Sequence, residues 1–158
     1  MGLRPLCVYG VGREVGMTSE PTKAVKTAIV GKNGGAWAIG FKGNTSWNYV
    51  EDCAAVFIGA ALSPNVTGAH ACNIRGVEAS VEEYVDIAKE LLGDSGAGIT
   101  VKADAVELPF PSNIDEAELT RLFAPGPVPC TSLREGIRKQ IDLFLDLQAR
   151  EQLHDRDI

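Results

Sequence analysis

Cysteine and histidine are the residue types in this sequence that most readily act as nucleophiles or metal ligands. The four cysteines form no C-x-x-C pair and the two histidines lie far apart. This spacing favours free thiols buried in a reducing compartment over a disulfide or a zinc site. We expect no catalytic residue and no metal site in this chain. The residues concerned are Cys7, Cys53, Cys72, Cys130, His70 and His154.

A glycine-rich stretch follows the first apolar segment and has the appearance of a phosphate-binding loop. Leu3–Tyr9 is typical of a buried strand, and Gly10–Gly16 carries three glycines directly after it. In a dinucleotide loop, a helix starts at the third glycine and receives the pyrophosphate on its N-terminus. Here the next helix is expected only near Pro21, and the glycine spacing is one residue too long. The stretch therefore favours a substrate-side loop, with an ordinary turn or a true nucleotide motif as the alternatives.

Length and composition indicate one globular domain. The chain has 158 residues, 45% of them hydrophobic, and a formal net charge of −6 with no basic run, which argues against nucleic acid as a partner. No apolar run reaches the roughly 20 residues that a membrane span needs, and we expect no signal peptide, since no charged segment followed by an apolar run opens the sequence. We therefore expect a cytoplasmic, substrate-binding-type domain over residues 1–158 that ends in a polar tail at 151–158.

Hydrophobic periodicity and capping residues predict strands that alternate with helices, which is the α/β class. Ser19, Asp52 and Thr131 are expected to cap helices, and Ser80 with Glu83 forms a capping box. The helix that begins at Asp52 is rich in alanine, so we expect it to pack closely against a sheet. Strands are expected over 3–9, 36–41, 47–50, 69–74 and 99–102, and helices over 19–30, 52–63, 80–92, 115–123 and from 131 onward.

Four segments, in the same order along the chain, resemble motifs of the extended short-chain dehydrogenase/reductase superfamily, of the NAD-dependent epimerase/dehydratase type. The first resembles the LRPxxVYGPG strand of that family, and the others resemble its YVxDxA, YNL…SVEE and TPLEEGI segments. They are Leu3–Gly10, Asn48–Ala54, Cys72–Ile74 with Ser80–Tyr84, and Thr131–Ile137. In that family these motifs belong to the C-terminal half. The resemblance implies part of a Rossmann-type sheet plus the small C-terminal α/β substrate-binding domain.

The resemblance also implies site residues. It places Pro5 and Leu6 near the nicotinamide carboxamide of the cofactor, and Cys7 where many members have a substrate-binding asparagine. Substrate contacts are implied for seven residues, which are Cys7, Tyr9, Arg13, Trp47, Asn48, Tyr49 and Arg75. The alternatives are burial in the core for Cys7, packing against the sheet for Trp47, Asn48 and Tyr49, and a surface position for Arg75.

The dinucleotide motif and the catalytic Tyr-x-x-x-Lys pair of the family have no counterpart in this sequence. NAD or NADP is therefore implied by the family only, and we expect this chain not to bind it tightly alone. Nucleotide-sugar members carry an Arg-Asp pair where Thr45 and Ser46 stand here. A neutral pair cannot clamp a diphosphate, so the resemblance implies a small or uncharged substrate.

Three functions remain open from the sequence. The chain is either the substrate-binding portion of an NAD(P)-dependent epimerase/dehydratase-like oxidoreductase that is not redox-competent alone, a stand-alone small-molecule-binding or dimerisation module, or a truncated product without a function. The expected partners are a small-molecule substrate and either the missing N-terminal half or a second copy, because the first strand leaves an open sheet edge.

Overall fold

The computed structural model describes residues 1–154, and these fold into three small β-sheets flanked by helices. The α-helices are α1 (Glu20–Val30), α2 (Val50–Leu62), α3 (Val81–Leu92), α4 (Ala117–Phe123) and α5 (Leu133–Ala149). The strands are β1 (Gly2–Arg4), β2 (Cys7–Tyr9), β3 (Trp37–Lys42), β4 (Asn44–Tyr49), β5 (Ala71–Asn73), β6 (Val77–Ser80) and β7 (Ile99–Glu107). Short 3-10 turns occupy Lys32–Gly35 and Gly93–Gly96.

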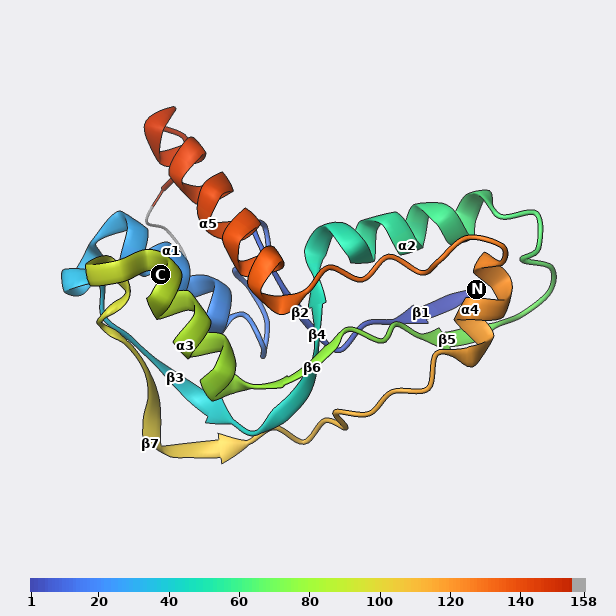
Figure 1. The fold of residues 1–158 in the computed structure, drawn as a ribbon, viewed down its shortest axis with the longest axis horizontal. Coiled ribbons are helices and arrows are strands. Elements are labelled where there is room, and N and C mark those ends of the chain that lie inside the picture. Colours follow the sequence, from blue (N-terminus) through green and yellow to red (C-terminus); the bar gives the residue numbers. More distant parts are fainter. Residues whose placement is uncertain (155–158) are drawn as a thin grey trace.

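The sheets follow one another along an elongated molecule (Figure 1). β1 pairs in parallel with β5 at one end, and β3 pairs in parallel with β7 at the other. Between these two sheets lies a three-stranded central sheet, in which β4 is the middle strand and runs parallel to β2 and antiparallel to β6. This alternation of strands and helices confirms the α/β class.

The prediction of one strand over residues 3–9 is wrong, because this segment forms two strands, β1 and β2. β1 and β2 are separated by Pro5 and Leu6, and they pair in different sheets. Proline has no N–H to give to a ladder, so a strand is readily interrupted there. The chain thus crosses from the end sheet to the central sheet at Pro5.

Of the four predicted helix caps, only Ser80 acts as expected: its hydroxyl accepts the Glu83 N–H at 2.9 Å. Ser19 instead donates its hydroxyl to the Gly16 carbonyl at 2.8 Å. Asp52 lies inside the first turn of α2, whose N-cap position is Tyr49. α5 is capped by Ser132, one residue after the predicted Thr131. The predictions for Asp52 and Thr131 are therefore wrong, whereas Ser19 stands at the predicted N-cap position of α1 but makes no capping hydrogen bond with its side chain.

Other differences concern the ends of elements. β6 was not expected at all, and β7 and β4 are longer than their predicted segments. α4 begins two residues late, since the Asp115 side chain accepts the Ala117 N–H at 2.9 Å and so stops the chain short of a helix there. Of the predicted polar tail, residues 155–158 lie outside the described part of the chain.

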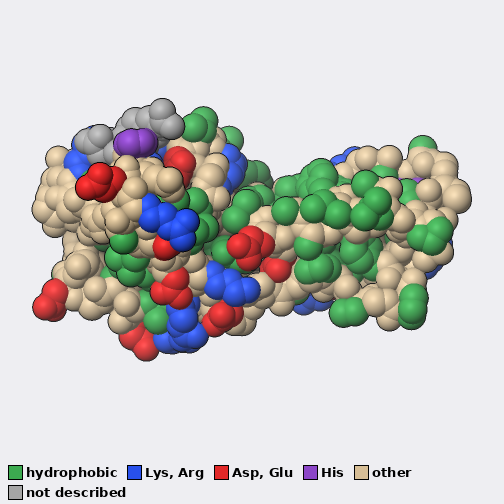
Figure 2. Space-filling model, turned by 90° about the horizontal axis from the view of Figure 1, so that it is seen from above, with side chains coloured by type: hydrophobic (Ala, Val, Ile, Leu, Met, Phe, Trp, Pro, Cys, Tyr) green, Lys and Arg blue, Asp and Glu red, His purple; other side chains and the backbone are tan. Residues whose placement is uncertain are grey.

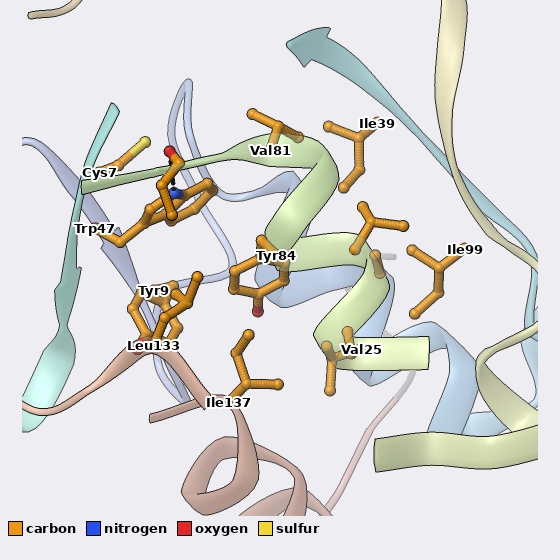
Figure 3. Close-up of a cluster of buried hydrophobic side chains, with 14 of the residues drawn as sticks. Cys7, Tyr9, Val25, Ile39, Trp47, Val81, Tyr84, Ile99, Leu133 and Ile137 are labelled. Atoms are coloured by element: carbon orange, nitrogen blue, oxygen red, sulfur yellow. Dashed lines mark hydrogen bonds between the residues drawn. The ribbon is translucent and has the colours of Figure 1, made fainter. Parts of the chain in front are cut away.

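The main hydrophobic core lies between the central sheet and helices α1, α3 and α5 (Figure 3). At its centre the Tyr84 ring stacks on Trp47, with 4.9 Å between ring centroids, and meets Tyr9 edge-on at 5.5 Å. α5 comes close enough that a Cβ on Gly136 would stand 2.0 Å from the Tyr9 hydroxyl. These contacts fix the central sheet against the C-terminal helix.

A smaller core lies between the β1–β5 sheet, α2 and α4. It is formed by Val56, Cys72, Ile74, Leu119 and Leu122. The expectation that the alanine-rich helix packs closely against a sheet is only partly met, because α2 buries three of its residues and leaves much of its surface exposed. Across residues 1–154, no helix is long and apolar enough to cross a membrane.

Candidate functional site

Some of the predicted site residues lie where the segment between β1 and β2 passes the segment between β5 and β6, and Asn48 joins these two crossover segments. Its side-chain oxygen accepts the Leu6 N–H at 3.1 Å, and its amide nitrogen donates to the Ile74 carbonyl at 3.3 Å. Leu6 lies between β1 and β2, and Ile74 between β5 and β6. Asn48 is buried. One amide side chain therefore holds the two sheets together at this junction.

A close backbone contact reinforces this junction. Gly76 donates its N–H to the Ser46 hydroxyl at 2.7 Å, and a Cβ at Gly76 would stand 1.9 Å from the Trp47 carbonyl oxygen. Only glycine fits so near to β4. Pro5 and Leu6 are half-buried at this place and Arg75 is exposed, so the junction offers both apolar and cationic surface.

The glycine-rich loop is anchored to α1 by a hydrogen bond from its backbone. The Gly10 N–H, which a phosphate loop would offer to its ligand, is donated to the Thr22 hydroxyl at 3.1 Å. Arg13 folds back onto the Val15 carbonyl. Glu14 lies 3.9 Å from the buried Lys26 amine. The Gly10 N–H, the Arg13 guanidinium and the Glu14 carboxylate thus all contact groups of the loop itself or of α1.

The N-terminus of α1 does not fit a dinucleotide. α1 begins at Glu20, so a carboxylate stands in the first turn, where a pyrophosphate would need positive potential. This helix start lies several residues beyond Gly16, as the sequence predicted. The placement of Pro5 and Leu6 near a nicotinamide ring stays a prediction from the resemblance, and no reaction step through NAD is derived from this chain.

Cys7 is fully buried. Burial raises the pKa of its thiol, while hydrogen bonds with Thr45 and Thr18 and the Arg13 charge lower it to a smaller extent. The raised pKa keeps the thiol protonated near neutral pH, which makes it a poor nucleophile. Cys7 is therefore a packed polar residue in this arrangement, next to the loop that carries Arg13.

The aromatic site residues belong to the core. Trp47 is 1% exposed and donates its indole N–H to the Ala79 carbonyl at 3.1 Å (Figure 3). Tyr9 is equally buried. Tyr49 is nearly so, and burial, together with Glu51 and Asp52, raises the pKa of its hydroxyl to about 12. Packing against the sheet, the alternative that the sequence left open for Trp47 and Tyr49, describes both of these residues, and Tyr9 packs in the same way.

The predicted residues therefore separate into two groups. Pro5, Leu6, Arg13 and Arg75 retain exposed surface. Cys7, Tyr9, Trp47, Asn48 and Tyr49 are buried. Any ligand at the junction would first meet the exposed group, while the buried group fixes the position of the backbone beneath it.

Asp52 is a positioning residue that the sequence did not reveal. Its carboxylate accepts the Thr131 N–H at 2.6 Å and the Thr131 hydroxyl at 2.9 Å. It thereby ties the first turn of α2 to the segment that enters α5. The two residues are 79 positions apart, so no local pattern pointed to the contact. Within the described residues, no group of three or more His, Cys, Asp or Glu side chains could hold a metal ion.

No protein-family model and no curated protein matches this chain. Similar solved structures do exist. A putative epimerase from Burkholderia cenocepacia has a TM-score of 0.69 and 18% sequence identity over 91% of this chain and 46% of its own. UDP-glucuronic acid 4-epimerase from Bacillus cereus, solved with a fluorinated UDP-sugar and NAD, has a TM-score of 0.66 and 19% identity over 92% of this chain and 45% of its own.

An epimerase from Methanothermobacter thermautotrophicus has a TM-score of 0.66 and 22% identity over 94% of this chain and 44% of its own. At such identities the likeness shows the fold: this α/β chain, with its small parallel and mixed sheets, matches part of the epimerase/dehydratase fold. The chain spans less than half of the length of the solved structures that it matches.

Proposed function

We propose that this chain is the substrate-side portion of an NAD(P)-dependent epimerase- or dehydratase-like oxidoreductase, and that it is the C-terminal part of such an enzyme. The observation that carries the proposal is the match of nearly the whole chain to less than half of an epimerase. We also propose that redox chemistry requires a further cofactor-binding polypeptide, which the misfit of the α1 N-terminus to a pyrophosphate supports.

The substrate we propose is small and uncharged. It lies at the junction, against Pro5 and Leu6, with Arg75 at the rim and Arg13 on the neighbouring loop. The neutral Thr45 and Ser46 are fully buried, so they offer no charge to a diphosphate. In this proposal the chain positions the substrate. Asn48 holds the two crossover segments together, and the side chains exposed on these segments contact the substrate.

The test is a titration followed by backbone amide NMR. Galactose, a neutral monosaccharide, is added to the free chain, and UDP-glucuronic acid is added to a second sample. We expect galactose at millimolar concentration to shift the amides of Leu6, Arg13 and Arg75, and Arg75→Ala to weaken the titration several-fold. Arg150→Ala, at the exposed end of α5, serves as the control. The absence of shifts at these amides, or a stronger response to UDP-glucuronic acid, would contradict the proposal.

A further inference from the structure

The loop that joins α2 to β5 is held on α4 by three side chains, at the end of the molecule that carries β1 and β5 (Figure 1). The Ser63 hydroxyl and the Asn65 amide donate to backbone carbonyls at the C-terminal end of α4, at 3.2 and 3.1 Å. The third side chain is His70, the last residue of the loop, which contacts the Glu118 carboxylate. Of these three contacts, only the one made by His70 depends on a titratable group of the loop.

Both ring nitrogens of His70 face an oxygen that accepts hydrogen bonds. Nδ1 lies 2.8 Å from the Glu118 carboxylate, and Nε2 lies 2.7 Å from the Thr67 carbonyl oxygen. A neutral imidazole has one N–H donor and one lone pair, whereas the doubly protonated ring has two N–H donors. Both distances are those of a hydrogen bond, so only the doubly protonated ring satisfies both contacts.

The Glu118 carboxylate stays an acceptor throughout the pH range in which histidines titrate. Hydrogen bonds from Arg121 and then from His70 lower the pKa of this carboxyl to about 2. Arg121 donates to it through Nε and Nη2, both at 2.9 Å. Glu118 therefore has no proton to share with His70, and a neutral ring cannot accept a hydrogen bond from it.

The other titratable and charged groups of the elements around the ring change little between pH 5.5 and 8.5. These groups are Glu118 and Arg121 of α4, Cys72 of β5, Arg4 of β1 and the Met1 amino group. Burial raises the pKa of the Cys72 thiol above its ordinary value of 9.0. The loop over 63–69 has no charged side chain, and Figure 2 shows that charged side chains gather toward the opposite end of the molecule. Only an imidazole and an amino terminus ordinarily change charge in this range.

We propose that His70 is a proton-dependent clasp between the α2–β5 loop and α4. The doubly protonated ring closes the clasp, with one N–H on Glu118 and the other on Thr67. When the ring releases a proton, Nδ1 keeps its hydrogen, because a lone pair facing a full negative charge is less favourable than one facing a carbonyl dipole. The contact with Thr67 is therefore the one that breaks. The loop loosens while His70 remains on α4.

The closed loop binds one more proton than the loosened loop. Closing is therefore favoured in acid, and the stabilisation is lost as the pH rises through the titration of the ring. Val66, one residue before Thr67, packs against the smaller core and lines a cavity of about 380 Å³ with Ser63. Proton release at His70 thus loosens one wall of this cavity. The inference goes beyond the proposed function, because no residue of the clasp belongs to the junction.

NMR of the ring nitrogens in the wild-type chain tests the protonation states directly. The chain contains only two histidines, His70 and His154, so their signals are readily told apart. At pH 5.5 we expect both nitrogens of His70 to carry a proton, and at pH 8.5 only Nδ1. Any other pattern at either pH would overturn the proposal. This measurement needs no variant, so it decides the matter even where a substitution prevents folding.

Urea unfolding measures what the clasp contributes. The ratio of the unfolding equilibrium constants of His70→Ala and wild type should be about ten-fold larger at pH 5.5 than at pH 8.5, as expected for the loss of one hydrogen bond. The exchange of the Val66 amide, which donates to the Ser63 carbonyl at 3.3 Å, locates the effect in the loop. Corrected for intrinsic exchange, its protection should fall from pH 5.5 to pH 8.5 in wild type.

His154→Ala is the matched control, because it removes the other histidine at an exposed position. It should keep the wild-type fall in Val66 protection, whereas His70→Ala should show weak protection at both pH values. A fall that persists in His70→Ala would assign the pH dependence to another group, such as the Met1 amino group, and would overturn the proposal. Equal protection of Val66 in wild type at the two pH values would overturn it as well.

Discussion

At the scale of single residues, Asn48 contributes most to the junction because it satisfies two backbone groups at once. The sequence placed Asn48 among the candidate site residues by resemblance, but its partners could not be foreseen. Leu6 and Ile74 are 42 and 26 positions away from it. Likewise, the sequence left open whether Trp47 and Tyr49 line a pocket or pack against the sheet. The contacts of Trp47 with Tyr84 of α3 and of Tyr49 with Lys139 of α5 decided for packing.

Asn48→Ala should lower the free energy of unfolding by about 2 kcal/mol, because a half-buried donor at Leu6 and a buried acceptor at Ile74 both lose their partner. Urea denaturation followed by circular dichroism measures the loss. Asn44→Ala, at the exposed start of the same strand, is the control and should change stability little. A variant at position 48 as stable as the wild type would show that the junction does not depend on this amide.

The cysteines should differ sharply in reactivity. Cys130 is exposed, whereas Cys7, Cys53 and Cys72 are buried. Burial, with a further effect of Asp52, raises the pKa of Cys53 to about 11, so almost none of it is thiolate near pH 8. We expect iodoacetamide at pH 8 to alkylate Cys130 alone in the folded chain, and all four cysteines in urea. Mass spectrometry of tryptic peptides gives the answer, and rapid labelling of Cys7 in the folded chain would contradict its burial.

At the scale of elements, the contacts that join α2 to the rest of the fold explain which predictions held. Where a signal was local, as in the capping box of Ser80 and Glu83, the helix start was predicted correctly. Where a tertiary contact engaged the expected capping side chain, the helix start was predicted wrongly. Asp52 has the composition of an N-cap, but its carboxylate binds Thr131 instead, and α2 begins two residues earlier. The local preference of a short polar side chain is too weak to exclude such a contact.

The bond between Asp52 and Thr131 should be measurable in a double-mutant cycle. We expect Asp52→Ala and Thr131→Ala to be non-additive, with a coupling free energy of about 1–2 kcal/mol, since a carboxylate accepts two hydrogen bonds there. Urea unfolding of both single variants and the double variant supplies the numbers. Glu51→Ala, one residue earlier and exposed, should show no coupling to Thr131→Ala. Additive effects at positions 52 and 131 would remove the proposed connection between α2 and α5.

A second connection, between α4 and the turn before β5, should respond to acid. Hydrogen bonds from Arg121 and then from His70 lower the pKa of the Glu118 carboxyl to about 2 from its ordinary value of 4.5. A lowered pKa stabilises the folded state above pH 4.5, and this stabilisation disappears as the pH falls toward 2. The stability difference between wild type and Glu118→Gln should therefore be largest at pH 6 and shrink by pH 3.

Urea unfolding at pH 6, 4 and 3 checks the acid dependence. Glu116→Gln provides the control, because no side-chain hydrogen bond holds the Glu116 carboxylate among the contacts described for residues 1–154. A difference for Glu118→Gln that stays constant from pH 6 to pH 3 would mean that the carboxylate is not held by Arg121 and His70 in solution.

At the scale of the whole molecule, the order of helices and strands along the chain was predictable, but the division of the strands among three separate sheets was not. Alternating helices and strands gave the α/β class. The division into three sheets depends on where the chain crosses, and Pro5 marked one of these crossings. The exposed face of α2 is the largest departure from expectation. Its alanines were expected to pack against a sheet, but in this chain much of the helix surface has nothing to cover it. The central proposal, that this chain is one part of a larger site and that the cofactor belongs to the other part, is consistent with this uncovered surface.

Calorimetry with NAD tests this claim most directly. NAD is titrated into the free chain and into a fusion in which the part of the Bacillus cereus UDP-glucuronic acid 4-epimerase that this chain does not match precedes Met1. We predict no measurable heat of binding for the free chain, because Glu20 opposes a pyrophosphate at α1 and the Gly10 N–H is already bonded to Thr22. We predict micromolar binding for the fusion. Micromolar binding of NAD by the free chain would contradict the account.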